Sequence, residues 1–295
     1  METLITRDVM RVAYYVDDFT DPWSQPETIL LLHPAMGNSQ RWFRWVPSLA
    51  RQYRIVRMDL RGHGASQIPK PEQEFSLDQL VDDVVELLDH LGLDDAHIVG
   101  NSAGGYVAQQ LAIQHPSRVK TLALFGSTPG LKNSHAPDWI PKIQEIGLKQ
   151  FLTDTIYERF DASADPRLVK WFIEQAGSND PNFIARFVLH MCSHYFMNEL
   201  SKIRCPTLIV AAGKESIGHA SAYEEMHEII TDSRLVYYDT AGHNICDGYP
   251  DRGAGDLLKF LAEATIHART SSHAVLDSRV ESICSYQHIS RLSSR

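Results

Sequence analysis

The sequence predicts an α/β fold in which a mostly parallel β-sheet is flanked by helices and carries an inserted helical lid. Short β-branched or leucine-rich runs alternate with helical patterns, and this alternation is typical of parallel sheets that are covered on both faces. The alternation stops between Ser127 and Arg204, where only helical patterns occur. A length of 295 residues fits one large domain or one domain with an insertion.

Composition and charge narrow the classes of function. Lys and Arg number 28 against 37 Asp and Glu, a formal charge of −9, and no basic stripe is present that would neutralise nucleic-acid phosphates. The apolar runs are strand length, far short of the roughly 20 residues of a membrane helix, and the first ten residues lack the apolar centre of a secretory signal. The scattered cysteines have neither disulfide nor zinc spacing: Cys192, Cys205, Cys246 and Cys284. We expect a cytoplasmic protein with a small-molecule substrate and no nucleic-acid or membrane partner; a homo-oligomer stays open.

Seven strands and three helices of the core are predicted from periodicity and end signals. The predicted strands are Val9–Val16, Thr28–His33, Tyr53–Asp59, Ala96–Gly100, Val119–Phe125, Thr207–Gly213 and Leu235–Asp239. Ser76, with Gln79 three residues later, predicts a capping box that opens an amphipathic helix. A second helix is expected from Ala103 to about His115, and a third from about Gly253 to Glu263.

The domain boundaries follow from these patterns. We predict a core of residues 1–127 and 205–265, a helical lid over 128–204, and a disordered tail over 266–295, which contains eight serines and four arginines. The lid helices are expected at Pro141–Tyr157, Pro166–Ala176 and Pro181–Phe196. Many aromatic residues fall in the lid. Most are expected to pack its own core, and the others to face a cleft between lid and sheet.

A Gly-x-Ser-x-Gly motif follows the predicted strand Ala96–Gly100 and precedes a helix. This order is typical of a nucleophile elbow, in which a sharp turn exposes the hydroxyl of Ser102 over the end of the sheet. The helix N-terminus beneath that serine places a positive dipole end where an oxyanion would develop. Ser102 is therefore the candidate nucleophile.

A serine hydroxyl needs a base, and His243 is the histidine best placed to be one. It follows the last predicted strand in the sequence Ala241-Gly242-His243, close to the carboxyl end of the sheet, where α/β proteins bind ligands. Its late position also satisfies the chain order nucleophile, acid, histidine.

These motifs, with Asp59–Ser66 and Cys205–Val210, resemble those of the α/β-hydrolase fold family, lidded type, over roughly residues 9–264. The resemblance implies a second oxyanion donor in the loop after the first parallel strand. That loop usually begins His-Gly, whereas here Pro34 follows His33 and has no N–H. By position the donor falls on Ala35, with Met36 next, and it acts together with the amide of Ala103.

The resemblance also implies a triad acid shortly after the sixth parallel strand, where this chain departs from the usual Gly-x-x-Asp pattern. Counting from Gly213 places Ser216 at that position, whereas counting back from Ile217 places Glu215 there. We favour Glu215, because a carboxylate is needed to fix the histidine tautomer and stabilise its charge. Asp239 is the reserve, and an acid replaced by Ser216 is a third alternative.

The expected reaction is acyl transfer to water without a metal or organic cofactor, on an ester or lactone of a small, apolar, ring-containing substrate. Met36, Trp139 and Phe187 are the candidates to line its pocket. Similarity to enzymes that split ring-cleavage diketones offers carbon–carbon bond hydrolysis as the alternative, with Arg186 holding a substrate carboxylate. A ligand receptor, or a lyase that uses the serine and histidine only as a base, also remains open.

Overall fold

The computed structural model describes residues 1–131 and 134–266. Residues Met1–Gly255 form one compact unit, and a second unit begins at Asp256. Because the described residues end at 266, the predicted tail 266–295 lies outside them, apart from Ile266, which is helical.

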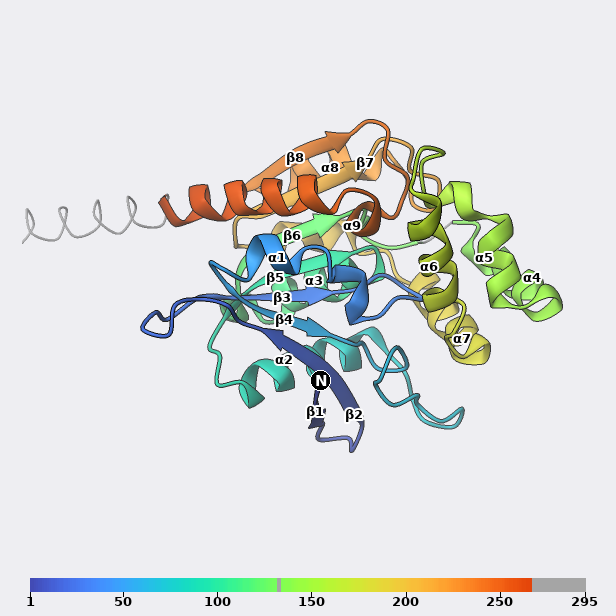
Figure 1. Ribbon diagram of the computed structural model, residues 1–295, viewed down its shortest axis with the longest axis horizontal. Helices are drawn as coiled ribbons and strands as arrows, with labels where there is room; N and C mark the ends of the chain where they lie inside the picture. The colour runs from blue at the N-terminus through green and yellow to red at the C-terminus, as the bar shows by residue number, and fades with distance from the viewer. Residues whose placement is uncertain (132–133, 267–295) are drawn as a thin grey trace, which may run out of the picture. The chain divides into compact units, whose positions relative to one another are not determined.

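The predicted mostly parallel sheet is confirmed (Figure 1). Its strands are β1 (Glu2–Ile5), β2 (Arg11–Asp17), β3 (Thr28–Leu32), β4 (Arg54–Met58), β5 (Ala96–Asn101), β6 (Val119–Phe125), β7 (Thr207–Ala212) and β8 (Ser233–Tyr238). They lie in the order β1-β2-β4-β3-β5-β6-β7-β8. β1 and β2 pair antiparallel with their neighbours, and all the other pairs are parallel. β3 and β5, at the centre, are buried along their whole length.

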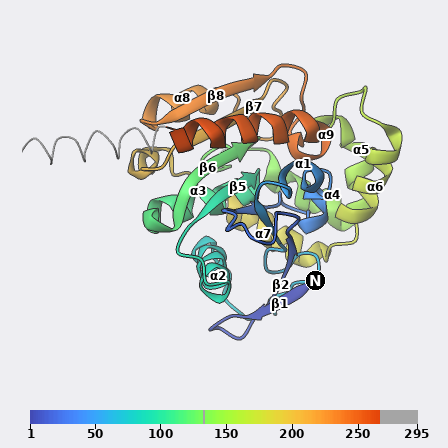
Figure 2. The same ribbon diagram turned by 60° about the vertical axis from the view of Figure 1, so that its left-hand side comes forward.

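Helices cover both sides of this sheet. They are α1 (Val46–Leu49), α2 (Leu77–His90), α3 (Ala103–Gln114), α8 (Ala222–Ile229) and α9 (Ile245–Gly248). A separate helix, residues 250–266, begins in the first unit and continues into the second. α3 packs against β5 and β6 and beside α2, on the side of the sheet opposite α1 (Figure 2). The capping box forms as predicted, since Ser76 Oγ accepts from the Gln79 amide and Gln79 Oε1 accepts from the Ser76 amide. No helix within residues 1–131 and 134–266 is long and apolar enough to cross a membrane.

A run of helices interrupts the sheet between β6 and β7. This helical insertion contains α4 (Trp139–Ile146), α5 (Leu148–Asp154), α6 (Pro166–Ala176) and α7 (Pro181–Cys192), together with short 3₁₀ turns. The first helix expected here is two helices, because Gly147 takes a positive φ of 80° and breaks it. Figure 1 shows α4 to α7 gathered beyond one end of the strands. That end is the carboxyl end, because β6 leads directly into the insertion.

Buried polar residues after β3 and β4 brace the loops at this end of the sheet. The Asp59 carboxylate accepts from the amides of Ser39 and Ala65, at 2.6 and 2.8 Å. His33 uses both ring nitrogens, since its Nδ1 lies 2.8 Å from the Pro34 carbonyl oxygen and its Nε2 accepts from the Leu60 amide at 3.0 Å. These bonds require a neutral imidazole with its proton on Nδ1.

Two buried histidines predict acid-labile stability. Burial lowers the pKa of His33 to about 4, and burial followed by the neighbouring His33 lowers that of His63 to about 3. Below pH 6.5 the unfolded chain takes up both protons and the folded chain does not, so stability falls as the pH falls towards the folded pKa values. We expect these two groups to remove about 2 kcal/mol per pH unit between pH 6 and pH 4.

Urea unfolding at pH 7, 6 and 5 measures this loss. His63 packs edge-on against Phe183 and Phe187, so His63→Phe fills a similar space without titrating. That variant should show about half of the pH slope attributed to the pair. A free energy of unfolding that stays constant from pH 7 to pH 5 would contradict the assignment.

Candidate active site

The turn between β5 and α3 presents the Ser102 side chain at the carboxyl end of the sheet. Ser102 has φ 51° and ψ −120°, a region that non-glycine residues rarely occupy, so the surrounding bonds must hold it there. Its amide donates to the Phe125 carbonyl at 3.2 Å, and its carbonyl accepts from the Gly105 amide at 2.8 Å. The backbone N–H and C=O groups of Ser102 are therefore both hydrogen-bonded, whereas its side-chain hydroxyl faces the pocket.

Glycines make this tight turn possible. A Cβ on Gly104 would lie 2.3 Å from the Leu32 carbonyl oxygen, and one on Gly100 would lie 2.5 Å from Gly105. Both distances are impossible for real side chains, so helix and strand approach as closely as they do only because these positions carry no Cβ.

His243, in the loop after β8, meets this serine. Its Nε2 lies 2.8 Å from Ser102 Oγ, which is hydrogen-bond distance. The loop is fixed from the insertion side, because the Asn244 amide donates to the Arg159 carbonyl at 3.0 Å. Gly242 allows that approach, since a Cβ there would lie 2.8 Å from the same carbonyl oxygen. The nucleophile and base candidates, 141 residues apart in the chain, are therefore in contact.

The other ring nitrogen of His243 bonds to Glu215. Nδ1 lies 2.8 Å from Oε1 and 3.0 Å from Oε2 of a carboxylate whose side chain is 0% exposed. Oε1 also accepts from the amides of Ile217 and Gly218, and Oε2 accepts from the Tyr223 hydroxyl at 2.7 Å. Burial alone raises the pKa of Glu215, but His243, Tyr223 and Gly218 outweigh burial and lower it to about 2. The carboxylate is ionised at neutral pH and holds the Nδ1–H tautomer.

The other acid candidates do not reach the histidine. Ser216 is exposed and donates to the Glu158 carbonyl, and Asp239 is exposed. Lys214, the residue before Glu215 in the chain, pairs with Asp161 at 3.0 Å and not with Glu215. The loop is therefore one residue shorter than the usual pattern, as counting back from Ile217 suggests.

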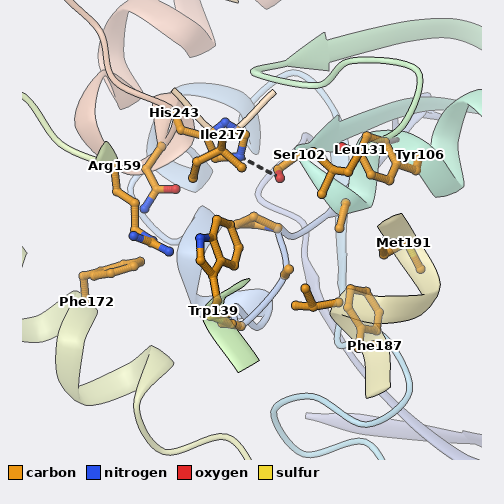
Figure 3. Close-up of a pocket in the computed structure, with 16 residues that line it drawn as sticks. Ser102, Tyr106, Leu131, Trp139, Arg159, Phe172, Phe187, Met191, Ile217 and His243 are labelled. Carbon is orange, nitrogen blue, oxygen red and sulfur yellow. Dashed lines mark hydrogen bonds between the residues drawn. The ribbon is translucent and has the colours of Figure 1, made fainter. Parts of the chain in front are cut away.

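A pocket of about 540 Å³, part of it open to solvent, lies over Ser102 and His243 (Figure 3). Predicted residues Ala35, Met36, Ala103, Trp139 and Phe187 all line it. The rest of its apolar lining is Pro34, Tyr106, Leu131, Phe172, Val188, Met191 and Ile217.

The loop after β3 supplies backbone groups to the same pocket. Ala103 is the first residue of α3, so its N–H has no acceptor within the helix. Met36 has φ 60°, and its carbonyl accepts from Asn179 Nδ2 of the insertion at 2.9 Å. Ala35 and Ala103, the two residues expected to supply oxyanion donors, both line the pocket that contains Ser102.

Arg186, predicted to hold a substrate carboxylate, does not line the pocket. Its guanidinium donates to the carbonyls of Lys70 and Gln73 and stacks 5.7 Å from the Phe75 ring centroid. The reason is helical phase: adjacent residues on α7 point about 100° apart, so Phe187 faces the pocket while Arg186 faces the loop before α2.

Three residues of the site were missed in the sequence. Tyr223 holds Glu215, while Arg159 and Asn244 are polar residues in the pocket wall. Tyr223 lies at a buried position of an ordinary amphipathic helix, and Arg159 lies in an aromatic run, so neither has a local signal. Asn244 had one, because it directly follows His243.

Comparison with known proteins finds a matching family, relatives in sequence and solved structures of similar fold. A family model described as alpha/beta hydrolase fold matches residues 27–169. The chain is 36% identical over 269 residues to a fluoroacetate dehalogenase of Burkholderia sp., a match that covers 80% of this chain and 87% of that protein. It is 24% identical over 265 residues to a pimeloyl-[acyl-carrier protein] methyl ester esterase of Nitrosospira multiformis, covering 85% and 98%. Its fold is similar to that of the enol-lactonase from Burkholderia xenovorans LB400, with a TM-score of 0.79, 21% identity and coverage of 88% and 100%.

Proposed function

Because this chain belongs to the alpha/beta hydrolase fold family and is a hydrolase, we propose that it is a cofactor-independent serine hydrolase of carboxylic esters or lactones. The observation that carries the proposal is the unbroken chain of hydrogen bonds from Ser102 through His243 to the buried carboxylate of Glu215. A hydroxyl in contact with an oriented imidazole is the arrangement that activates serine as a nucleophile.

The reaction follows from the roles of these groups. His243 Nε2 takes the proton of Ser102 as Oγ attacks the substrate carbonyl, and the amides of Ala35 and Ala103 stabilise the oxyanion. His243 then gives the proton to the leaving oxygen, which leaves an acyl group on Ser102. Water, deprotonated by His243, attacks the acyl carbon, and His243 returns the proton to Ser102 Oγ as its bond to the acyl group breaks. Glu215 stays ionised throughout and stabilises the imidazolium.

The pocket supports a small, apolar, ring-containing substrate. Aromatic side chains of the insertion, Trp139, Phe172 and Phe187, form much of its wall, so the insertion acts as a lid over Ser102. Similarity to an esterase and, in fold, to an enol-lactonase is consistent with ester or lactone chemistry. Carbon–carbon bond hydrolysis stays the alternative, although Arg186, the residue expected to hold a carboxylate in that reaction, faces away from the pocket.

Stopped-flow hydrolysis of p-nitrophenyl acetate tests the proposal. We expect a burst of nitrophenolate equal to the enzyme concentration, followed by slower turnover, and peptide mass spectrometry should find the acetyl group on Ser102. Ligand-induced thermal stabilisation without turnover would instead indicate a receptor. Product formation with no acyl group on Ser102 would indicate that the serine and histidine act only as a base.

A further inference from the structure

A second polar feature of the pocket is the side chain of Arg159, which the ester mechanism does not use. It follows a 3₁₀ turn of the insertion, is 5% exposed, and lines the pocket together with Ser102 and His243. Nη1 donates to the carbonyl and hydroxyl oxygens of Thr155, at 3.0 and 2.8 Å. Nε and Nη2 donate to no acceptor within residues 1–131 and 134–266. More than half of the guanidinium donors therefore have no partner there.

The charge of Arg159 is also poorly balanced. The carboxylate of Glu158 is 3.6 Å from Nη1 but 43% exposed to solvent, and the nearest rings are those of Trp139 and Phe151, at 5.4 and 5.6 Å. The buried carboxylate of Asp247 does not balance the charge of Arg159, because it accepts hydrogen bonds from two nitrogens of Arg41 and so neutralises that arginine. Burial lowers the pKa of Arg159 to about 10, with Glu158 opposing and Arg41 adding to the effect. A buried cation is costly without a close anion, so this one is set up for a counter-ion from outside the chain.

Asn244 adds an independent observation at the same place. The residue is 5% exposed, and its side-chain Nδ2 is buried without a hydrogen-bond partner in the described part of the chain. It lines the pocket beside Arg159, and its own amide bonds to the Arg159 carbonyl, which fixes the two residues relative to each other. Buried polar groups without a partner are rare in native proteins and often mark functional positions.

The pocket is therefore polar at one end and apolar at the other. Figure 3 shows Arg159 on the His243 side of the pocket, near Phe172, whereas Tyr106 and Met191 lie beyond Ser102 on the opposite side. The reacting carbonyl has to sit between these two ends, over the Ser102 hydroxyl.

We propose that Arg159 and Asn244 form a carboxylate-binding subsite, so that the substrate is an ester or lactone that carries a free carboxylate at one end and an apolar group at the other. The inference rests on the proposed hydrolase function and adds the substrate class. A carboxylate fits because a guanidinium donates two parallel hydrogen bonds to its two oxygens, and Asn244 Nδ2 supplies a third donor.

A matched pair of esters measures the preference directly. The p-nitrophenyl monoester of glutaric acid carries the carboxylate, and its methyl-capped diester does not. The wild-type ratio of kcat/KM, charged over capped, should be about 10- to 100-fold above that of Arg159→Met, which keeps the length and removes the charge. Asn244→Asp, of equal size, should also lower the ratio by placing a negative charge beside the carboxylate. A second pair, phenyl acetates with and without a ring carboxylate, tests the alcohol side of the scissile bond.

Arg186→Met is the matched control, because Arg186 lies on the same insertion but outside the pocket. Its ratio should equal that of the wild type. The subsite is overturned if neither pair shows a preference for the charged ester, or if Arg159→Met lowers both members of a pair equally. It is also overturned if Arg186→Met lowers the ratio as strongly as Arg159→Met.

A binding measurement tests the carboxylate-binding subsite independently of the hydrolysis reaction. Calorimetric titration of Ser102→Ala with monomethyl glutarate requires no turnover, and Arg159→Met in that background should weaken binding at least tenfold. If no ester is hydrolysed but this difference in binding is found, the proposed function fails and the subsite stands. If esters are hydrolysed and the difference is absent, the subsite fails alone. The melting temperature of Arg159→Met should stay close to that of the wild type, because removing a poorly balanced buried charge offsets the loss of the hydrogen bonds to Thr155. A marked fall would indicate a structural role instead.

Discussion

Ser102→Ala is expected to lower kcat for p-nitrophenyl acetate by roughly 10⁴- to 10⁶-fold. The variant retains the pocket, the oxyanion amides and the His243 to Glu215 pair, but it has no atom that can form the acyl bond. The burst should disappear, and steady-state rates measured at equal enzyme concentrations will give the residual activity. Substrate binding should persist, because the hydroxyl is a single group in a mostly apolar wall.

The stability of this variant distinguishes a catalytic from a structural role. Ser102 is bound to its surroundings through its backbone, and its side chain contributes only the bond to His243 Nε2. The free energy of unfolding should therefore stay within about 1 kcal/mol of the wild type. Ser216→Ala is the control, since that serine is exposed and contacts only a backbone carbonyl; it should retain full activity. Substantial turnover by Ser102→Ala would exclude an acyl-enzyme on this residue.

The central elements of the fold were predictable because their signals are local. β3 and β5 are uninterrupted apolar runs, and α2 has both a capping box and an apolar stripe. β1 was missed because it is a short edge strand of which only Leu4 is buried. β8 begins at Ser233, two residues before the predicted start, because the polar residues at its beginning pair with β7 without being buried.

The residues of the candidate site also differ in whether a local sequence signal identifies them. Ser102 and His243 each belong to a motif that can be read within a few residues, and the structure brings the two together. Glu215 could be ranked but not assigned, because the length of its loop decides which side chain faces the ring. Arg159 and Arg186 were not separable by sequence, since both lie among aromatic residues. Which arginine faces the pocket depends on how the insertion packs on the loop after β8.

The second large effect is expected for Glu215→Gln, which should lower kcat by about 10³- to 10⁴-fold. The two carboxylate oxygens accept from two backbone amides, from the Tyr223 hydroxyl and from His243 Nδ1. An amide of the same shape has one oxygen and one NH₂, so a donor then meets a donor or the network rearranges. The negative charge that stabilises the imidazolium is lost in either case. Steady-state kinetics on the p-nitrophenyl acetate reaction measures the effect.

The free energy of unfolding shows whether the negative charge of Glu215, and not only the shape of its side chain, stabilises the fold. The pKa of Glu215 is about 2 in the folded protein against an ordinary value of 4.5, so its contribution is fully present above pH 4.5 and is lost as the pH falls towards 2. This contribution amounts to about 3 kcal/mol. The wild type should therefore be more stable than Glu215→Gln at pH 7, and the gap should narrow as the pH falls below 4.5.

Two further variants assign the effect to this carboxylate. Tyr223→Phe removes one hydrogen bond but keeps the charge and the contact with His243, so it should cost about tenfold in kcat, far less than the amide. Asp239→Asn alters the exposed reserve carboxylate and should leave the rate unchanged. If Glu215→Gln keeps wild-type activity while Asp239→Asn loses it, the histidine is oriented by Asp239 in the working enzyme. If both variants keep it, no carboxylate is needed, and the stabilised imidazolium on which the proposed reaction depends does not form.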